Sequence, residues 1–341
     1  SLTNGTTFNT AGSTTTLSAN QHLVIAGATQ IASGATLTLD GGSLTSGSLT
    51  LAGNFSGNGV LAAEISGTSA NVITANNSLT IGKSTSVNGF NFAGTLNIGG
   101  NAVILRDANT ANLGALTTVS TGGSLTSSNG ITLAVGDVVT ASGAADINGD
   151  FVNLGTVNGA TGSDFLNFTG AVTGTGNYTG NIQFSDEFRP GNSPGIVNLE
   201  NMTLTSTSSL FIEIEGVLSS EFDQLLISND AVFDGTFDVI LSGGFNLDEN
   251  MEFLVADVGG TQSGFFSGLD EGGIVVANNN GFDLLLSYVG GDGNDLRLYT
   301  AISTVPEPGT LGLVGCLTMG YFARRRWRKK QSRNLPPSHT T

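Results

Sequence analysis

The sequence has a single cysteine and very few histidine, tryptophan and basic residues. Cys316 has no partner for an intrachain disulfide, so a disulfide framework is excluded. The two histidines, His22 and His339, lie far apart in the sequence and cannot supply a catalytic triad or a histidine-based metal site within the body, residues 1–302. The only tryptophan, Trp327, follows that body, which therefore contains no tryptophan for stacking against sugar rings. A body without cysteine is compatible with export.

Positive charge is scarce and concentrated near the C-terminus. Seven of the 11 Lys and Arg residues lie between 324 and 333, behind a long apolar run. Residues 1–323 hold all 27 acidic residues and only four basic ones, Lys83, Arg106, Arg189 and Arg297. Because such a surface repels phosphate backbones, the composition argues against nucleic acid as a partner.

The residues that are abundant favour strands and turns. The chain has 50 glycines among 341 residues, together with many Ser, Thr and Asn residues, and few strong helix formers. Short segments such as TLTL, SLTI and TLNI place aliphatic residues two apart, for example Leu37/Leu39, Leu79/Ile81 and Leu96/Ile98. That spacing is typical of a strand with one buried face. The sequence therefore predicts an all-β protein.

Two architectures fit many short strands with Gly and Asn between them. In a parallel β-solenoid, the inward aliphatic residues of each coil stack on those of the next, and Gly or Asn takes the positive φ at corners. A β-sandwich needs longer paired strands and hairpin turns, for which few signals are present. We favour a parallel, right-handed β-helix-like solenoid over residues 1–195. Its repeats are irregular, since the tripeptide SLT recurs at 43, 48, 78 and 124 without a constant period.

After residue 195 the segments become longer and richer in Phe, Ile and acidic residues. In LFIEIEG, Glu213 and Glu215 alternate with Ile212 and Ile214, which gives one polar and one apolar face. We expect residues 196–302 to form a C-terminal β region that caps the solenoid, because an uncovered last coil would expose apolar side chains and an unpaired edge.

Residues 303–330, STVPEPGTLGLVGCLTMGYFARRRWRKK, contain the longest apolar run of the chain. Residues 309–323 carry no charge and as a helix would extend about 22 Å, short of a hydrocarbon core of about 30 Å, although basic side chains can snorkel and bilayers can thin. Pro306 and Pro308 suit a helix boundary, and the basic cluster that follows matches a cytoplasmic flank. The pattern predicts one short transmembrane helix. A buried core element followed by a solvated basic tail is the alternative.

This C-terminal segment resembles a PEP-CTERM sorting signal. The resemblance rests on the triplet Pro306, Glu307 and Pro308, the short apolar segment, and the arginines Arg324, Arg325 and Arg326. It implies a Gram-negative-type bacterial protein that is exported, held transiently in the inner membrane through 309–323, and processed by an exosortase, a membrane transpeptidase. The triplet would be recognised by that enzyme and the three arginines would stop transfer. Unlike most such signals, this one is followed by residues 331–341, which we expect to be a disordered tail.

The body resembles the β-helical regions of PEP-CTERM proteins and autotransporter passengers more loosely. The similar stretches are FVNLGTVNG, RPGNSPGIVNL, FDQLLISNDAVFDGTFDVIL and YVGGDGNDLRLY. This resemblance supports the solenoid and implies no particular activity.

Few residues of the body suggest catalysis. A polysaccharide lyase needs a basic residue as general base, and the four in the body are widely separated. A glycosidase needs paired carboxylates. Asp146 with Asp150, or Asp234 with Asp238, would supply them, but residues four apart on a strand lie on one solvent face and are explained by solvation. No catalytic residue is assigned.

Two stretches are weakly similar to calcium-binding motifs. DINGDFVN, residues 146–153, has Phe151 where an EF-type loop needs Gly. GGDGND, residues 290–295, matches one unit of a glycine-rich calcium repeat, but a single copy lacks a second coil to complete a site, so a turn is the simpler interpretation. We assign no metal and no cofactor.

The sequence favours a non-enzymatic structural or adhesive protein of the bacterial cell surface or extracellular matrix, for which an exopolysaccharide is a candidate partner. The alternative is a β-helical protein that binds or degrades polysaccharides.

Overall fold

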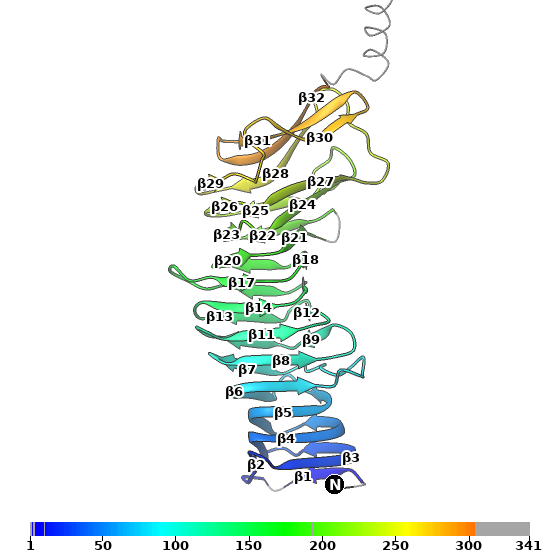
Figure 1. Ribbon diagram of the computed structural model, residues 1–341, viewed down its shortest axis with the longest axis vertical. Helices are drawn as coiled ribbons and strands as arrows, with labels where there is room; N and C mark the ends of the chain where they lie inside the picture. Colours follow the sequence, from blue (N-terminus) through cyan, green and yellow to red (C-terminus); the bar gives the residue numbers. More distant parts are fainter. Residues whose placement is uncertain (1, 3, 10, 192–193, 304–341) are drawn as a thin grey trace, which may run out of the picture.

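The computed structural model describes residue 2 and residues 4–9, 11–191 and 194–303. All regular structure within these residues is β, and the strands form an elongated stack of coils (Figure 1). The predicted all-β parallel solenoid is confirmed.

The strands belong to three sheets that run along the stack. Within the described residues the first sheet has 19 strands, namely β1 (Thr6–Phe8), β2 (Thr14–Ser18), β3 (His22–Ile31), β4 (Thr36–Leu51), β5 (Asn54–Gly67), β6 (Val72–Gly82), β7 (Thr95–Gly99), β8 (Ala102–Arg106), β10 (Leu116–Val119), β11 (Ser124–Ser127), β13 (Val138–Ala141), β14 (Ala145–Asn148), β16 (Thr156–Asn158), β17 (Leu166–Phe168), β19 (Asn177–Thr179), β20 (Asn181–Phe184), β23 (Asn201–Leu204), β26 (Ala231–Phe233) and β29 (Gln262–Gly264). The second comprises β9 (Ala111–Leu113), β12 (Ile131–Leu133), β15 (Phe151–Asn153), β18 (Val172–Gly174), β21 (Glu187–Pro190), β24 (Ser209–Ile214) and β27 (Thr236–Leu241). The third comprises β22 (Ile196–Leu199), β25 (Gln224–Ile227), β28 (Glu252–Val258), β30 (Gly273–Asn279), β31 (Phe282–Gly290) and β32 (Asp295–Ile302).

The core is built from columns of inward side chains, one from each coil. One continuous column of parallel register pairs consists of Thr15, Leu37, Phe55, Ile73, Leu96, Thr117, Val139, Val157 and Tyr178. From Leu37 onward every member is at most 2% exposed. With strands about 4.8 Å apart, its eight steps cover about 38 Å of the stack. The buried face of each coil is thus covered by its neighbours.

Aromatic residues fill the middle coils of the core. The rings of Phe184 and Phe188 stack with centroids 4.1 Å apart, and the Phe168 ring stacks on Phe184 at 5.7 Å. Tyr178 meets Phe184 edge-on at 5.8 Å. Offset and edge-on contacts of this kind add to the burial of apolar area.

Coils differ in length, which explains the irregular repeat in the sequence. More residues of the sequence separate the register partners Ile73 and Leu96 than separate Leu37 and Phe55. The partners Leu225 and Ala256 are still farther apart in sequence. In the SLT tripeptides at 43, 48, 78 and 124 the leucine is nevertheless fully buried, at Leu44, Leu49, Leu79 and Leu125.

Loops at the corners absorb the extra residues. At the corner residue Gly149, φ is +99° and a Cβ would collide with the Ser127 carbonyl oxygen of the adjacent coil. Glycine is therefore required at this corner, where the chain passes close to the coil beside it.

The parallel stacking continues past residue 195. β23 pairs with β20 in register, and β24 pairs with β21. The longer segments, rich in Phe, Ile and acidic residues, that begin near residue 195 coincide with the start of the third sheet at β22 and with longer coils. Met202 is farther in sequence from its partner Ala231 than from its partner Ile182 on the other side.

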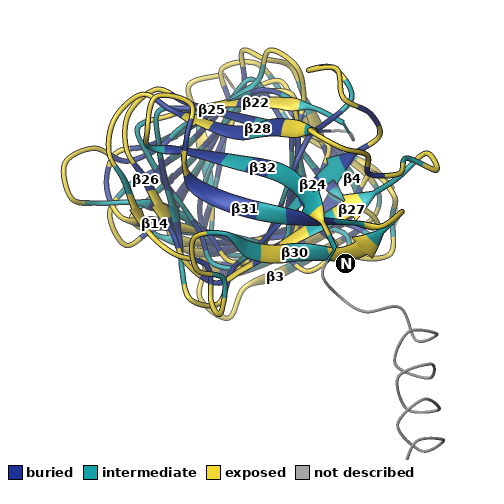
Figure 2. Ribbon diagram, turned by 90° about the horizontal axis from the view of Figure 1, so that it is seen from above, coloured by how far each residue is buried: buried dark blue, intermediate teal, exposed yellow. Residues whose placement is uncertain are grey.

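Antiparallel strands close one end of the stack. β32 pairs with β28 and with β31, and β31 pairs with β30, all antiparallel. Figure 2 shows these strands lying across the end of the coils. Beneath them, the Tyr288 hydroxyl donates to the Leu269 carbonyl oxygen at 2.8 Å and accepts from the Phe266 N–H at 3.0 Å. The last described residue, Ser303, follows this cap, at the opposite end of the stack from the N-terminus (Figure 1).

No helix in residues 2, 4–9, 11–191 and 194–303 is long and apolar enough to cross a membrane. The predicted transmembrane helix at 309–323 and the tail at 331–341 lie outside the described residues.

Thr117 is a fully buried threonine of the column and provides a test of it. Its side chain is fully buried between Leu96 and Val139, and its hydroxyl has no hydrogen-bond partner. Thr117→Val keeps the shape and removes the unpaired hydroxyl, so we expect the free energy of unfolding to rise by about 1 kcal/mol in urea titrations. The matched change Thr118→Val removes an outward hydroxyl that donates to Asn97 Oδ1 at 3.0 Å and should give no gain. Destabilisation by Thr117→Val would contradict this account of the core.

Candidate functional site

Three of the four carboxylates that the sequence suggested as pairs, Asp146, Asp150 and Asp234, accept hydrogen bonds within the fold. On the exposed face, Asp146 accepts a hydrogen bond from Asn167 Nδ2 at 3.1 Å, and Asp150 accepts one from the Ala171 N–H at 3.2 Å. Both bonds reach the next coil. Asp234 accepts from the N–H of its neighbour Gly235 at 2.7 Å, in a turn. These contacts are the ones expected of structural acids.

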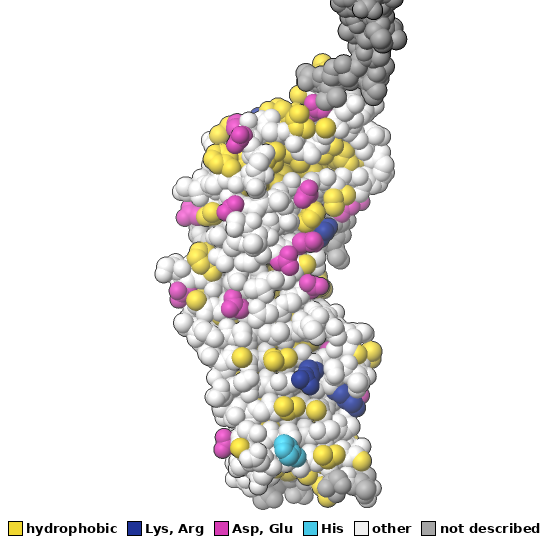
Figure 3. Space-filling model, viewed as in Figure 1, with side chains coloured by type: hydrophobic (Ala, Val, Ile, Leu, Met, Phe, Trp, Pro, Cys, Tyr) yellow, Lys and Arg dark blue, Asp and Glu magenta, His cyan; other side chains and the backbone are white. Residues whose placement is uncertain are grey.

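The basic residues of the body are spread over separate coils, and three of them are paired with acids. Arg189 bonds Glu187 at 2.9 Å, Arg297 bonds Glu252 at 3.0 Å, and Lys83 lies 4.0 Å from Glu64. On the face shown in Figure 3, basic side chains are few and acidic ones are scattered. His22 is exposed, and its Nδ1 lies 2.7 Å from Ser43 Oγ. The structure does not bring these residues together.

The 290–295 segment is a turn that fastens the cap to the last coil. Asp295 is buried, and its Oδ1 accepts from the Val258 N–H at 2.7 Å. Asn294 donates from Nδ2 to the carbonyl oxygens of Val258 and Gly260, at 2.7 and 2.6 Å. Within the described part of the chain, no group of three or more His, Cys, Asp or Glu side chains is placed to hold a metal ion.

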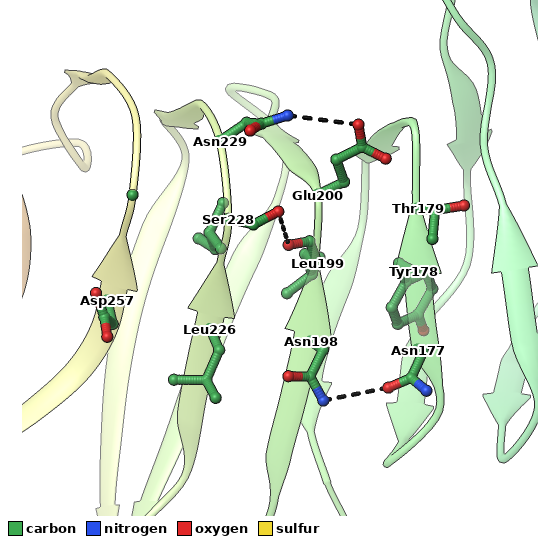
Figure 4. Close-up of a pocket in the computed structure, with 12 residues that line it drawn as sticks. Asn177, Tyr178, Thr179, Asn198, Leu199, Glu200, Leu226, Ser228, Asn229 and Asp257 are labelled. Atoms are coloured by element: carbon green, nitrogen blue, oxygen red, sulfur yellow. Dashed lines mark hydrogen bonds between the residues drawn. The ribbon is translucent and has the colours of Figure 1, made fainter.

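An open groove lies across the outer faces of β19, β22, β25 and β28 (Figure 4). Its volume is about 720 Å³, within the range of ligand-binding clefts. Its residues form two rows along the stack. The first row consists of Asn177, Asn198, Leu226 and Asp257, and the second row, two residues further along the chain in each coil, consists of Thr179, Glu200, Ser228 and Gly259. We refer to these eight residues as the outer groove.

The outer groove lies over an interruption in strand pairing. β19 pairs with β16 and β22 pairs with β25, but no register pairing joins β19 to β22. Side chains connect the two strands instead. Asn198 Nδ2 donates to Asn177 Oδ1 at 3.1 Å, and Glu200 Oε2 accepts from the Gly180 N–H at 2.7 Å. The carboxylate of Glu200 also accepts from Asn229 Nδ2 at 3.4 Å, which fixes it at the rim.

The start of β22 is held by a buried acid. Asp223 is 2% exposed, and its two carboxylate oxygens accept from the N–H groups of Gly195 and Glu213 at 2.7 and 2.8 Å. Burial raises the pKa of the Asp223 carboxyl to about 6, and the two backbone donors only partly oppose that rise. This residue therefore positions the β22 wall of the outer groove.

The sequence did not indicate the outer groove. Its members are ordinary outward residues of short strands. The steps along its first row, from Asn198 to Leu226 and from Leu226 to Asp257, are wider in sequence than those of the earlier coils. The available signal was outward polar residues beside an exposed leucine, which is too common to identify a site.

The sorting-motif residues Pro306, Glu307 and Pro308, and the arginines Arg324, Arg325 and Arg326, lie outside the described residues. Residues 304–329 match the family model of the PEP-CTERM protein-sorting motif. A search among curated proteins found no match to the chain. The chain thus carries a PEP-CTERM sorting motif behind a β-solenoid body, which indicates an exported protein handled by an exosortase-type system and destined for the cell surface or the exterior.

The raised pKa of Asp223 predicts a pH dependence of stability. The folded chain binds a proton here more tightly than the unfolded chain, whose carboxyl has the ordinary pKa of 3.8. The contribution of Asp223 is therefore most favourable below about pH 4 and declines by up to about 3 kcal/mol as the pH rises through 6. We expect urea unfolding at pH 4 to 7 to show this decline and Asp223→Asn to reduce it. The exposed-site control Asp238→Asn should retain it, and an equal slope in all three proteins would refute the assignment.

Proposed function

We propose that this protein is a non-enzymatic structural or adhesive rod of the bacterial surface or extracellular matrix. In this proposal, residues 309–323 hold the chain briefly in the inner membrane, and an exosortase then processes it at Pro306, Glu307 and Pro308. The observation that supports the proposal is the position of the sorting motif. In the sequence it follows directly after the last strand of the cap, β32, so the proposed membrane segment is joined to the capped end of the elongated stack (Figure 1).

The packing of the body supports a mechanical role. Each coil buries its inward face against two neighbours, and side-chain hydrogen bonds connect the outer faces as well. Asn148 donates to Thr126 at 3.1 Å and accepts from Thr169 at 2.8 Å. Asn158 connects Thr140 and Thr179 in the same way, at 3.1 and 2.9 Å. A stack whose coils are joined by apolar packing in the core and by hydrogen bonds on the outer faces should resist stretching.

The residue contacts also favour a role without catalysis. Three of the four candidate carboxylates bond to neighbouring coils or turns, and three of the four basic residues in the body are paired with acids. A general acid or base would need a group free to exchange protons with a substrate.

The second candidate is a polysaccharide-binding or polysaccharide-degrading protein, and the outer groove is the observation that favours it. Incubation of the purified chain with pectins, alginates and other glycans distinguishes a protein that binds polysaccharides from one that degrades them. Release of reducing ends or unsaturated products above background would contradict a structural role.

The sorting step predicts the behaviour of one variant. Glu307→Ala removes the acidic residue of the triplet, so we expect the chain to remain unprocessed and membrane-bound in an exosortase-containing host. Chain mass and membrane fractionation measure this. The control Glu249→Ala, in an exposed turn of the body, should be processed like the wild type.

Surface attachment of the cells tests the adhesive role. A strain without the protein should attach less, the wild-type chain should restore attachment, and the Glu307→Ala chain should not. Normal attachment by the deletion strain would refute this role while leaving the sorting assignment intact.

A further inference from the structure

We propose that the outer groove binds an oligosaccharide chain of amino sugars, with the sugar chain lying along the stack across β19, β22, β25 and β28. This inference rests on the proposed adhesive role and assigns its contact site. It follows from the shape of the groove, its charge, and the hydrogen-bonding groups that the fold leaves free there.

The shape suits an extended polar ligand. The outer groove is open along its length, and each of its rows places one residue on each coil, about 4.8 Å apart along the axis. A polymer with repeating units can therefore place successive units over successive coils. Leu226, which is 36% exposed between Asn198 and Asp257, provides an apolar surface for the C–H face of a sugar ring.

The charge of the outer groove favours a cation over an anion. Glu200 and Asp257 line it, and no Lys, Arg or His residue is among its lining residues. Asp257 is exposed and forms no hydrogen bond or ion pair within the described residues, so its carboxylate is free to meet an ammonium group. Uronate chains would instead be repelled by both carboxylates.

The polar groups of this face are less satisfied than those of the coils before it. In the earlier coils, Asn148 and Asn158 each use both ends of the amide to join adjacent coils. In the outer groove, the row through Asn177 and Asn198 has one such amide bond and cannot continue it, because the next residue in the row is Leu226. The Oδ1 atom of Asn198 and the Nδ2 atom of Asn177 are left to bond a ligand (Figure 4). Hydroxyl and amino groups of a sugar match both atoms, because they donate as well as accept.

Calorimetric titration of the full-length chain, solubilised in mild detergent at pH 6, tests the proposal. The probes are the hexamer of glucosamine, the hexamer of N-acetylglucosamine and the hexamer of galacturonic acid. We expect the glucosamine hexamer to bind most tightly, with an affinity that falls as salt is added, and the galacturonate hexamer not to bind.

Two variants locate the binding. Leu226→Arg should weaken binding of the glucosamine hexamer at least tenfold, because it removes the apolar surface of Leu226 and adds a positive charge to the outer groove. Its matched control is Val232→Arg, which changes an outward residue of similar exposure on β26, 38% against 36%, and should bind normally. Asp257→Asn should weaken the glucosamine hexamer about threefold and leave the neutral hexamer unchanged, as expected for a surface charge pair.

The outcomes separate this inference from the proposed function. Absence of binding by the amino-sugar hexamer, equal binding of the galacturonate hexamer, or unchanged binding by Leu226→Arg would overturn the assignment. If Leu226→Arg does not fold, as judged by its far-ultraviolet circular dichroism, Asp257→Asn still decides. The Glu307→Ala processing experiment and the cell-attachment assay test the proposed function independently of these binding results.

Discussion

The structure depends on the in-register stacking of inward side chains between parallel coils. A single coil has no core of its own, because its aliphatic residues are buried only when the coils above and below cover them. The columns through Leu37, Phe55 and Ile73, and the aromatic stack of Phe168 and Phe184, show this directly. The same constraint explains the antiparallel cap of β30–β32, since the last coil has no successor to cover it.

Because stacking fixes only the inward positions, the strands could be predicted from the sequence more readily than the spacing between them. The alternation at Leu37/Leu39, Leu79/Ile81 and Leu96/Ile98 predicted buried faces, and all six side chains are at most 2% exposed. Ile212 and Ile214 are likewise buried, with Glu213 and Glu215 outward. Corner loops accept different numbers of residues without disturbing the columns, so coil length left no constant period in the sequence.

That freedom in coil length is also the reason why the outer groove could not be predicted. The groove forms in the coils that contain more residues, as the sequence separation of the register partners Met202 and Ala231 shows. It also lies where the strand pairing between β19 and β22 is interrupted. Whether Asn177 lies beside Asn198 depends on how the intervening segment crosses the stack. The buried Asp223 that holds β22 forms its bonds with residues far from it in sequence or around a bend. Local periodicity contains none of this information.

Stacking also accounts for the unusual composition of the surface. In a parallel register each outward residue lies beside its equivalent in the next coil, so a charged residue repeated along a row would face like charges about 4.8 Å away. Asn, Thr and Ser avoid that repulsion and bond one another from coil to coil, as Thr126, Asn148 and Thr169 do. Only 11% of the residues are charged, which fits this constraint. On such a sparsely charged, self-bonded surface, the outer groove combines two carboxylates that have no basic partner with an exposed leucine, Leu226.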